Sequence, residues 1–470
     1  MPPMRACFAA VVKSAISALE EFDDGFVRAT EPELLAYHYQ EAGDFSAALA
    51  HWIAAGDVSE ERSANAEAVA HYRSARALTE DADRSAADRV RAAEVLLKLG
   101  NAQWQTAGYQ AKEVMQSYRA ARETALALDQ QDEAAEAEIR IAAGVGFSCR
   151  NREVLELGNN ILRRGPDRLR PETLVHIWLQ IGAGHCHMGD FEQSLAFSEK
   201  AIELDNRVNC RHKAPGSGAD PAIVARDPAE MALRPLGRLD RALAISEQGM
   251  AIALDRGHLF SVVWASVSRV LALTSFGRYA EAVDCADEAL AICERHGFDT
   301  RIGNVLQHRG PALFELGDEE RGLADIERGV ILWREGSGTF LLTRNLAKLA
   351  EYQLRAHRLE EARANLHVAE RLADTTDEKM HLAEIIRLRG RLWQAEGNYD
   401  HARLCFERAI ACSREQSARL FELNAGRDLA RHDGEAGDTT EALATLRGIV
   451  DWFPASLDVP VLAECRARLL

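Results

Sequence analysis

GRYAEAVDCADEALAICERHG, residues 277–297, contains the repeat unit on which the architecture of this chain rests. Gly277 ends one helix, because glycine adopts a left-handed backbone conformation at little cost. Tyr279 follows and packs the turn. Ala282 and Ala289 lie seven positions apart on one face of the next helix, where small side chains let two antiparallel helices approach closely. The segment therefore predicts a helix–turn–helix unit.

The same unit recurs with a fixed period through the second half of the chain. The turn residues, each forty positions after the last, are Gly237, Gly277, Gly317, His357, Gly397 and Gly437. A small residue recurs five places after each turn, and again twelve places after every turn but the last. A fixed period in this range is typical of stacked supersecondary units. Each such repeat packs only on its neighbours, so the 470 residues need no division into ordinary globular domains.

Less regular copies extend the pattern toward the N-terminus. GDFSAALAHWIAAG (43–56) and GDFEQSLAFSEKAIELD (189–205) are the clearest, and the spacing predicts a further turn at 149–152. Together these units predict an all-α, right-handed solenoid of about ten helix pairs, divided into two arcs.

The predicted boundary between the arcs lies where the period is interrupted. The extra residues fall in NRVNCRHKAPGSGADP (206–221), whose Pro, Gly, Ser and Asp content predicts a loop. Asp220 is the expected N-cap of the next helix, with Pro221 in its first turn. Pro228 and Pro235 each cost roughly 3 kcal/mol inside a helix, so that helix is expected to be short, kinked or displaced. Four regions follow: an N-terminal helix or linker (1–30), N-terminal helical repeats (31–205), an insertion loop with an irregular helix (206–235) and a C-terminal repeat array (236–470).

Bulk composition restricts the possible partners. With 56 basic and 73 acidic residues the formal net charge is −17. Such a chain is poorly suited to binding the phosphate backbone of nucleic acids and should avoid anionic membranes. It contains no run of about eighteen apolar residues that would span a bilayer. The start of the chain is interpreted as an amphipathic helix rather than a signal peptide. The nine scattered cysteines favour reduced, mostly buried thiols in a cytoplasmic protein.

The Gly–x–Tyr–x–x–Ala turn and the alanine seven places later resemble tetratricopeptide repeats, in a forty-residue version. Three segments, 33–75, 205–243 and 417–454, are similar to the C-terminal helical region of bacterial signalling proteins that carry a class III adenylate/guanylate cyclase domain and an AAA-type ATPase module. Pro228 and Pro235 interrupt the central segment, where that family continues without proline. The chain has no G-x-x-x-x-G-K-[ST] phosphate loop, and the repeats begin too early for a cyclase domain's paired aspartates to precede them. The resemblance therefore implies the regulatory, protein-binding tail without the two activities.

No catalytic or metal-binding constellation is predicted. His185 and His187 are two positions apart, so they point to different faces of a helix, and no second ligand pair accompanies them. Cys210 and His212 lie in the predicted insertion loop, where solvent exposure is expected. No Ser/His/Asp or Cys/His arrangement can be assigned from spacing in an all-helical stack. We therefore expect neither an enzyme nor a bound cofactor.

The resemblance implies that the first helix of each pair lines a concave groove, at places thirteen, ten and six residues before each turn. The candidate binding residues at those places are Asn304, Arg344, Arg387, Arg391, Asn424, Arg427 and Arg431. The pairs 387/391 and 427/431 each share a helix face, and arginine forks bind carboxylates in bidentate fashion. This pattern predicts a seat for an acidic peptide segment. The alternative is that these arginines are solvated, or paired with carboxylates of the chain itself such as Glu351 or Glu384.

The expected function is a non-catalytic scaffold or sensor in bacterial signal transduction, which binds a protein or peptide segment in the groove. Two alternatives stay open: a regulatory fragment of a cyclase–ATPase polypeptide, and a solenoid that senses a small ligand beneath the loop at 206–221. The groove hypothesis predicts that Arg387→Glu with Arg427→Glu abolishes partner capture without lowering the melting temperature. Sequence leaves the partner and the oligomeric state open.

Overall fold

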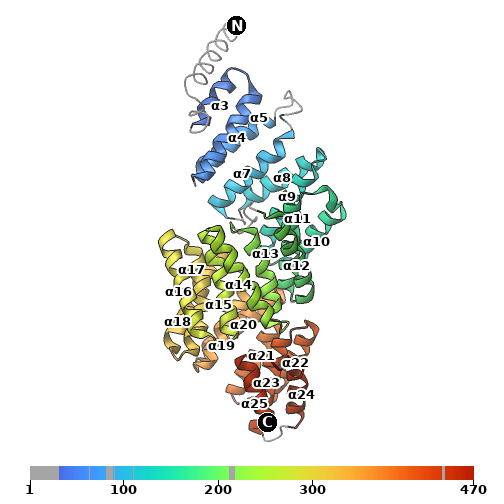
Figure 1. The fold of residues 1–470 in the computed structure, drawn as a ribbon, viewed down its shortest axis with the longest axis vertical. Coiled ribbons are helices and arrows are strands. Elements are labelled where there is room, and N and C mark those ends of the chain that lie inside the picture. The colour runs from blue at the N-terminus through green and yellow to red at the C-terminus, as the bar shows by residue number, and fades with distance from the viewer. Residues whose placement is uncertain are drawn as a thin grey trace. The chain divides into compact units, whose positions relative to one another are not determined.

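The computed structural model describes residues 31–470, except 63, 81–87, 89, 109–110, 211–217 and 437–439 (Figure 1). All regular elements within these described stretches are helices, and successive helices pack on one another as antiparallel pairs. This confirms the predicted all-α solenoid. The helix expected within 1–30 lies outside the described residues.

The chain forms two compact units. The first comprises Met1–Gly144 together with Arg163–Thr173, and the second comprises Val145–Leu162 with Leu174–Leu470. Helices of the first unit are α3 (Pro32–Glu41), α4 (Phe45–Glu61), α5 (Asn65–Thr79), α7 (Ala92–Ala107), α8 (Lys112–Ala127) and most of α9 (Gln131–Phe147). The first unit also contains a short 3₁₀ turn, η1 (Pro166–Arg168).

The second unit contains the regular repeats. It begins with α10 (Asn151–Arg163), α11 (Pro171–Met188), α12 (Phe191–Val208) and α13 (Pro221–Leu233). The periodic helices that follow are α14 (Leu239–Arg256), α15 (Leu259–Ser275), α16 (Tyr279–His296), α17 (Asp299–Glu315), α18 (Glu319–Ser337), α19 (Leu342–Arg355), α20 (Leu359–Thr375), α21 (Leu382–Ala395), α22 (Tyr399–Glu415), α23 (Arg419–Ala436), α24 (Thr440–Val450) and α25 (Pro460–Arg468).

The turn residues of the forty-residue period adopt the conformation that their positions require. Gly277 has φ +72° and Gly397 has φ +79°. His357 takes the same left-handed conformation, with φ +59°, although it carries a side chain. The turn predicted at 149–152 also forms, with Cys149 at φ +56° between α9 and α10. Gly437 lies outside the described residues.

Small residues let the two helices of a pair touch. A Cβ added to Gly310 on α17 would lie 2.5 Å from the carbonyl oxygen of Gly322 on α18. A Cβ on Gly329 would lie 2.7 Å from the backbone nitrogen of Gln307. Because neither position has space for a methyl group, glycine fixes the distance between α17 and α18.

The helix with the predicted prolines forms, and it is short. Asp220 caps α13 by accepting a hydrogen bond from the amide of Ala222, and Pro221 occupies the first turn, both as predicted. Pro228 lies inside the helix, which ends at Leu233 before Pro235. The two ends of the insertion are held by one residue of α14. The Arg256 guanidinium donates to the Asn209 side chain at 2.8 Å and forms an ion pair with Asp220.

Repeats far apart in sequence meet within the second unit. The Lys379 amide donates to the carbonyl of His187 at 2.8 Å, and the Leu420 amide donates to the carbonyl of Pro235 at 2.9 Å. One apolar cluster joins Phe191 and Leu233 with Met380 and Phe421, and other members come from α14 and α18. The second unit therefore closes on itself, so that α11–α13 pack against α21–α23 and the segment that precedes α21.

This closure encloses the inner layer of helices. Alternate helices touch directly in the pairs α13–α15, α15–α17, α19–α21, α21–α23 and α23–α25. In an open solenoid, polar residues on this layer would face solvent. Here Gln307, Asn345 and Arg387 are each 0% exposed. The concave face is consequently an interior surface lined with polar and charged groups.

Candidate functional site

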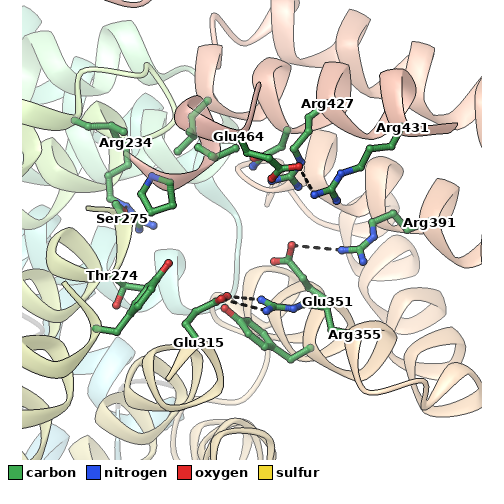
Figure 2. Close-up of a pocket in the computed structure, with 17 residues that line it drawn as sticks. Arg234, Thr274, Ser275, Glu315, Glu351, Arg355, Arg391, Arg427, Arg431 and Glu464 are labelled. Carbon is green, nitrogen blue, oxygen red and sulfur yellow. Dashed lines mark hydrogen bonds and ion pairs between the residues drawn. The ribbon is translucent and has the colours of Figure 1, made fainter. Parts of the chain in front are cut away.

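A cavity of about 450 Å³ opens on the inner layer of the second unit, and we call it the groove pocket. Its lining, drawn as sticks in Figure 2, consists of Arg234, Leu239, Thr274, Ser275, Tyr279, Glu315, Glu351, Tyr352, Arg355, Arg391, Leu420, Asn424, Arg427, Arg431, Pro460, Val461 and Glu464. These residues come mainly from the first helices of successive pairs, α15, α17, α19, α21 and α23, with α25 completing the wall. The volume lies within the range of ligand-binding sites.

Four of the seven candidate residues predicted from sequence line the groove pocket. They are Arg391, Asn424, Arg427 and Arg431. The first comes from α21 and the other three from α23, so stacking of neighbouring repeats brings them together as the groove-facing rule implied.

Most guanidinium groups in the groove pocket already have carboxylate partners from the chain. Arg427 and Arg431 both pair with Glu464 of α25, and Arg355 pairs with Glu315 (Figure 2). Arg391 is an exception: its contact with Glu351 measures 4.0 Å, which is too long for a hydrogen bond. Arg391 and Arg234, whose contact with Glu230 measures 3.7 Å, are therefore the least compensated cations of the pocket.

Arg387 does not reach the pocket, because it is the centre of a buried ion-pair network. Its guanidinium donates to Asp428 at 2.6 Å, to Glu384 at 2.7 Å and to Glu351 at 2.8 Å. Although burial alone would lower it, these carboxylates hold the pKa of Arg387 well above its usual value. The same contacts keep the pKa of Asp428 below its usual value against the opposing effect of burial. Arg387 is therefore paired with carboxylates of the chain itself, which was the alternative to ligand binding. Arg387→Glu would lower the stability of the fold.

The remaining two candidates, Asn304 on α17 and Arg344 on α19, lie outside the groove pocket in a second group of side chains. We call this group the inner cluster, and it comprises Glu230, Asn304, Gln307, His308, Arg344, Asn345, Lys348, Glu378 and His381.

Helical spacing connects the inner cluster with the groove pocket. On α19, Arg344, Lys348, Glu351 and Arg355 follow one another at three- or four-residue intervals, so they share a face. The last two of these line the pocket. On α13, Glu230 and the pocket residue Arg234 are also four apart. The inner cluster is therefore the continuation of the same helix faces away from the pocket.

Several polar atoms of the inner cluster are buried without a hydrogen-bond partner in the described structure. Both amide atoms of Gln307, the carbonyl oxygen of the Asn304 side chain and the amide nitrogen of the Asn345 side chain lack one. So do both carboxylate oxygens of Glu230, which is 1% exposed and 3.7 Å from Arg234. Unpaired buried polar groups are costly in proteins and are usually hydrogen-bonded to water or to a ligand. The inner cluster therefore has unused hydrogen-bonding capacity.

The charges of the inner cluster are poorly compensated. Burial, assisted by the positive charge of Arg344, lowers the pKa of Lys348 well below its usual value. Burial likewise lowers the pKa of His308 and of His381, so both rings are neutral at pH 7. Burial raises the pKa of Glu230 and of Glu378 to about 7, which leaves both carboxyl groups partly protonated at neutral pH. Arg344 and Lys348 are therefore cations without full anionic partners.

Sequence reasoning missed Lys348 and Glu230 as groove residues. Lys348 lies nine residues before the turn at His357, outside the thirteen, ten and six rule. The four-residue spacing from Arg344 to Lys348 was the available signal. Gln307 lies ten residues before Gly317 and so fits the spacing rule, but an uncharged amide gives no pattern that would mark it as a binding residue.

The other predicted polar groups have local roles. His185 contacts Asp190 at 3.1 Å and His187 contacts Asn151 at 3.3 Å, so the two rings point to different partners. Cys210 is 2% exposed, so the expectation that it faces solvent is wrong. Burial of this thiol follows from the Arg256 contacts that draw the end of the insertion onto the helices. His212 lies outside the described residues.

In the part of the chain that the structure describes, no group of three or more His, Cys, Asp or Glu side chains is arranged to hold a metal ion. No helix among these residues is long and apolar enough to cross a membrane.

Comparison with known proteins gives structural neighbours only. No protein-family model and no curated protein matches this chain. A Rap protein complexed with competence and sporulation factor aligns over 91% of this chain and 99% of its own, with 12% identity and a TM-score of 0.51. The apo quorum sensor NprR from B. thuringiensis covers 76% of this chain and 97% of its own at 13% identity, with a TM-score of 0.48. Apo RapI covers 90% and 98% at 11% identity, with a TM-score of 0.34.

The first neighbour shows a shared helical-repeat fold and, at this identity, nothing beyond the fold. The TM-scores of the other two are too low to support an argument. The narrower resemblance to the tail of a cyclase–ATPase protein therefore stays a prediction from sequence.

Proposed function

We propose that this chain is a non-catalytic regulatory protein whose second unit binds a protein or peptide segment along its enclosed concave face. The main support is the set of buried side-chain amides on the inner helix layer that have polar atoms without a partner: both amide atoms of Gln307, the oxygen of Asn304 and the nitrogen of Asn345. A side-chain amide offers both a donor and an acceptor, which matches the two polar groups of a peptide bond. An extended segment carries such groups at every residue, so it can satisfy several amides at once.

The groove pocket supports the same proposal because it provides an opening of suitable size next to these amides. Its volume of about 450 Å³ has room for part of a segment. Arg391 and Asn424 line it and are not engaged in close ion pairs, so they are available to a ligand. The Rap neighbour of similar fold is described in complex with a factor, which gives a precedent for ligand binding by this fold.

The experiment is selection of peptides from a random-sequence display library by the full chain. Enriched sequences are then tested for affinity to wild type, to an Asn424→Ala/Arg391→Gln variant and to an Arg408→Gln control, whose exposed side chain lies on the outer helix α22. The proposal predicts enrichment of related sequences, and a loss of affinity of about tenfold or more in the pocket variant alone. Absence of enrichment, or equal binding by all three proteins, contradicts it.

Sensing of a small ligand is the second candidate, and the cavity volume is equally compatible with it. The loop suggested as a lid contains residues 211–217, which lie outside the described residues, so the lid stays a proposal. The third candidate, a regulatory region of a cyclase–ATPase polypeptide in bacterial signal transduction, rests on the sequence resemblance alone. That the bound segment is acidic is likewise a proposal. The charges of the groove pocket and the inner cluster indicate where its carboxylates would bind.

A further inference from the structure

The arginines that suggested an acidic ligand are mostly neutralised by the chain itself. Arg387 has three carboxylate partners, and Arg427 and Arg431 share Glu464. An incoming carboxylate at these positions would have to displace an existing ion pair. The groove pocket therefore offers little net attraction to an anion beyond Arg391 and, at its boundary, Arg234.

The inner cluster differs because its cations lack close anions. Among the residues that the structure describes, Lys348 makes no hydrogen bond or ion pair. Arg344 donates only to the neighbouring Asn345 side chain, at 3.2 Å. Arg234, at the boundary between the inner cluster and the pocket, donates to Ser275 at 3.3 Å and lies 3.7 Å from Glu230. Three cationic groups from α13 and α19 thus face one region without a carboxylate at hydrogen-bonding distance.

Neutral donors and acceptors surround these cations. Gln307 and Asn345 are fully buried, and both amide atoms of Gln307 and the amide nitrogen of Asn345 have no partner. Nδ1 of His308 donates to the backbone carbonyl oxygen of Asn304, 2.6 Å away, and its Nε2 has no partner. Arg344 and Lys348 are half-buried, and removing a cation from water is costly unless an anion or several hydrogen bonds accompany it. The arrangement is therefore incomplete without a bound group.

From this geometry we infer that the inner cluster is a carboxylate-binding site, in which Arg344 and Lys348 hold the anionic group and Gln307 and Asn345 hold its neighbouring polar atoms. The guanidinium of Arg344 offers paired donors that match the two oxygens of a carboxylate. Lys348, one turn further along α19, adds a third donor. The inference rests on the proposed function for one source of the carboxylate, a bound segment that reaches inward from the groove pocket. A free small carboxylate is the other source.

Acidic side chains of the cluster limit which ligands fit. Asp227, Glu230 and Glu378 face the same region, and burial raises the pKa of each carboxyl group. A ligand with a single carboxylate is accommodated because these groups can remain protonated. A polyanion would meet acids on several sides, so phosphate-rich ligands are disfavoured.

The test compares wild type with an Arg344→Gln/Lys348→Gln variant and with the exposed control Arg408→Gln. An enriched peptide is synthesised with its carboxylates intact and with each one, including the terminus, converted to the amide. Wild type and the control should lose about tenfold in affinity on one such conversion, whereas the double variant should bind both forms alike. In parallel, sodium butyrate, which has a single carboxylate, and its uncharged amide are added at constant ionic strength, and the melting temperature is measured. Thermal unfolding without ligand shows whether the variant is folded, and Lys348→Arg should retain the preference for the acid form.

The outcomes separate this inference from the proposed function. Discrimination between acid and amide peptides in wild type but not in the double variant supports both. If no peptide is enriched but butyrate raises the melting temperature of wild type and not of the double variant, the site stands with a free carboxylate as its ligand. If a peptide binds with no difference between acid and amide, and butyrate shifts all proteins equally or none, the carboxylate site is wrong and segment binding stands. If neither peptide nor butyrate binds, both are wrong.

Discussion

The groove pocket and the inner cluster lie on the same helices, yet they differ in how their charges are compensated. In and behind the pocket, Arg387, Arg427 and Arg431 are matched by Asp428, Glu384 and Glu464. In the inner cluster, Arg344 and Lys348 have no such partners. Ion pairs formed within the chain stabilise or orient the repeats, whereas the uncompensated, half-buried charge of Arg344 and Lys348 is retained at a cost. The comparison indicates that arginine count is a poor guide to a binding site and that missing partners are a better one.

The largest expected effect on stability comes from removing Arg387, the centre of the compensated ion-pair network. Arg387→Met leaves three carboxylates beside an apolar side chain, so the free energy of unfolding should fall by about 3 to 5 kcal/mol. Chemical denaturation measures it. Arg408→Met, at an exposed position on α22, should change it by less than about 0.5 kcal/mol. A small effect at Arg387 would mean that the network contributes little and that the guanidinium is free to bind ligand.

The acids of the inner cluster should make stability depend on pH. The pKa of Glu378 is raised by burial to about 7 in the folded protein, from an ordinary value of 4.5. The folded state then binds more protons than the unfolded state between these values, so this group destabilises the fold as pH rises from 4.5 to 7. Glu378→Gln should abolish this part of the pH dependence, which amounts to up to about 3 kcal/mol in the free energy of unfolding. Denaturation curves at pH 5 and pH 8 measure the difference, and the exposed Glu415→Gln should leave the pH dependence unchanged.

A packing change should disturb the inner cluster without touching its charges. In Gly329→Ala the added methyl group meets the backbone of Gln307, so a loss of about 1 to 3 kcal/mol in stability is expected. Gly336→Ala on the same helix α18 is the matched control, because nothing lies within 4 Å of its Cβ. That control should be neutral or stabilising, since alanine is the better helix former. Equal effects of the two substitutions would contradict the close contact between α17 and α18.

The smallest expected effect has the opposite sign. Because burial lowers the pKa of Lys348, the unfolded state binds more protons than the folded state, and this group becomes less destabilising as pH rises toward 10.5. Lys348→Met should therefore raise the free energy of unfolding at pH 7 by about 1 kcal/mol. Arg431→Met, which loses the ion pair with Glu464, should lower it slightly. Destabilisation by Lys348→Met would show that the cation has a partner in solution and that the inner cluster is a structural feature.

Much of the fold follows from local sequence rules, and this explains which predictions succeeded. The period located every described turn of the regular array, including His357, because a left-handed residue must end each helix whatever its side chain. The cap formed by Asp220 and Pro221 was equally local. Repeat stacking then brought Arg391 together with Asn424, Arg427 and Arg431 in the groove pocket.

Closure of the second unit could not be derived in this way. Contacts such as Leu420 with Pro235 depend on the curvature that accumulates over many repeats, and the period does not specify it. Without closure the concave side chains appear exposed, so sequence alone could not show that Arg387 is buried or that Gln307 lacks a partner. The pairing of Arg387 with Asp428 crosses one repeat interface, and a search for carboxylates about forty residues away would have indicated it.

The most direct test of segment binding in the concave face is hydrogen–deuterium exchange of the full chain with and without an enriched peptide. Bound peptide should slow exchange in α17, α19 and α23, the inner helices that supply the amides and cations, and leave the outer helices α16, α18 and α22 unchanged. Protection confined to the outer helices, or to the first unit, would contradict the account.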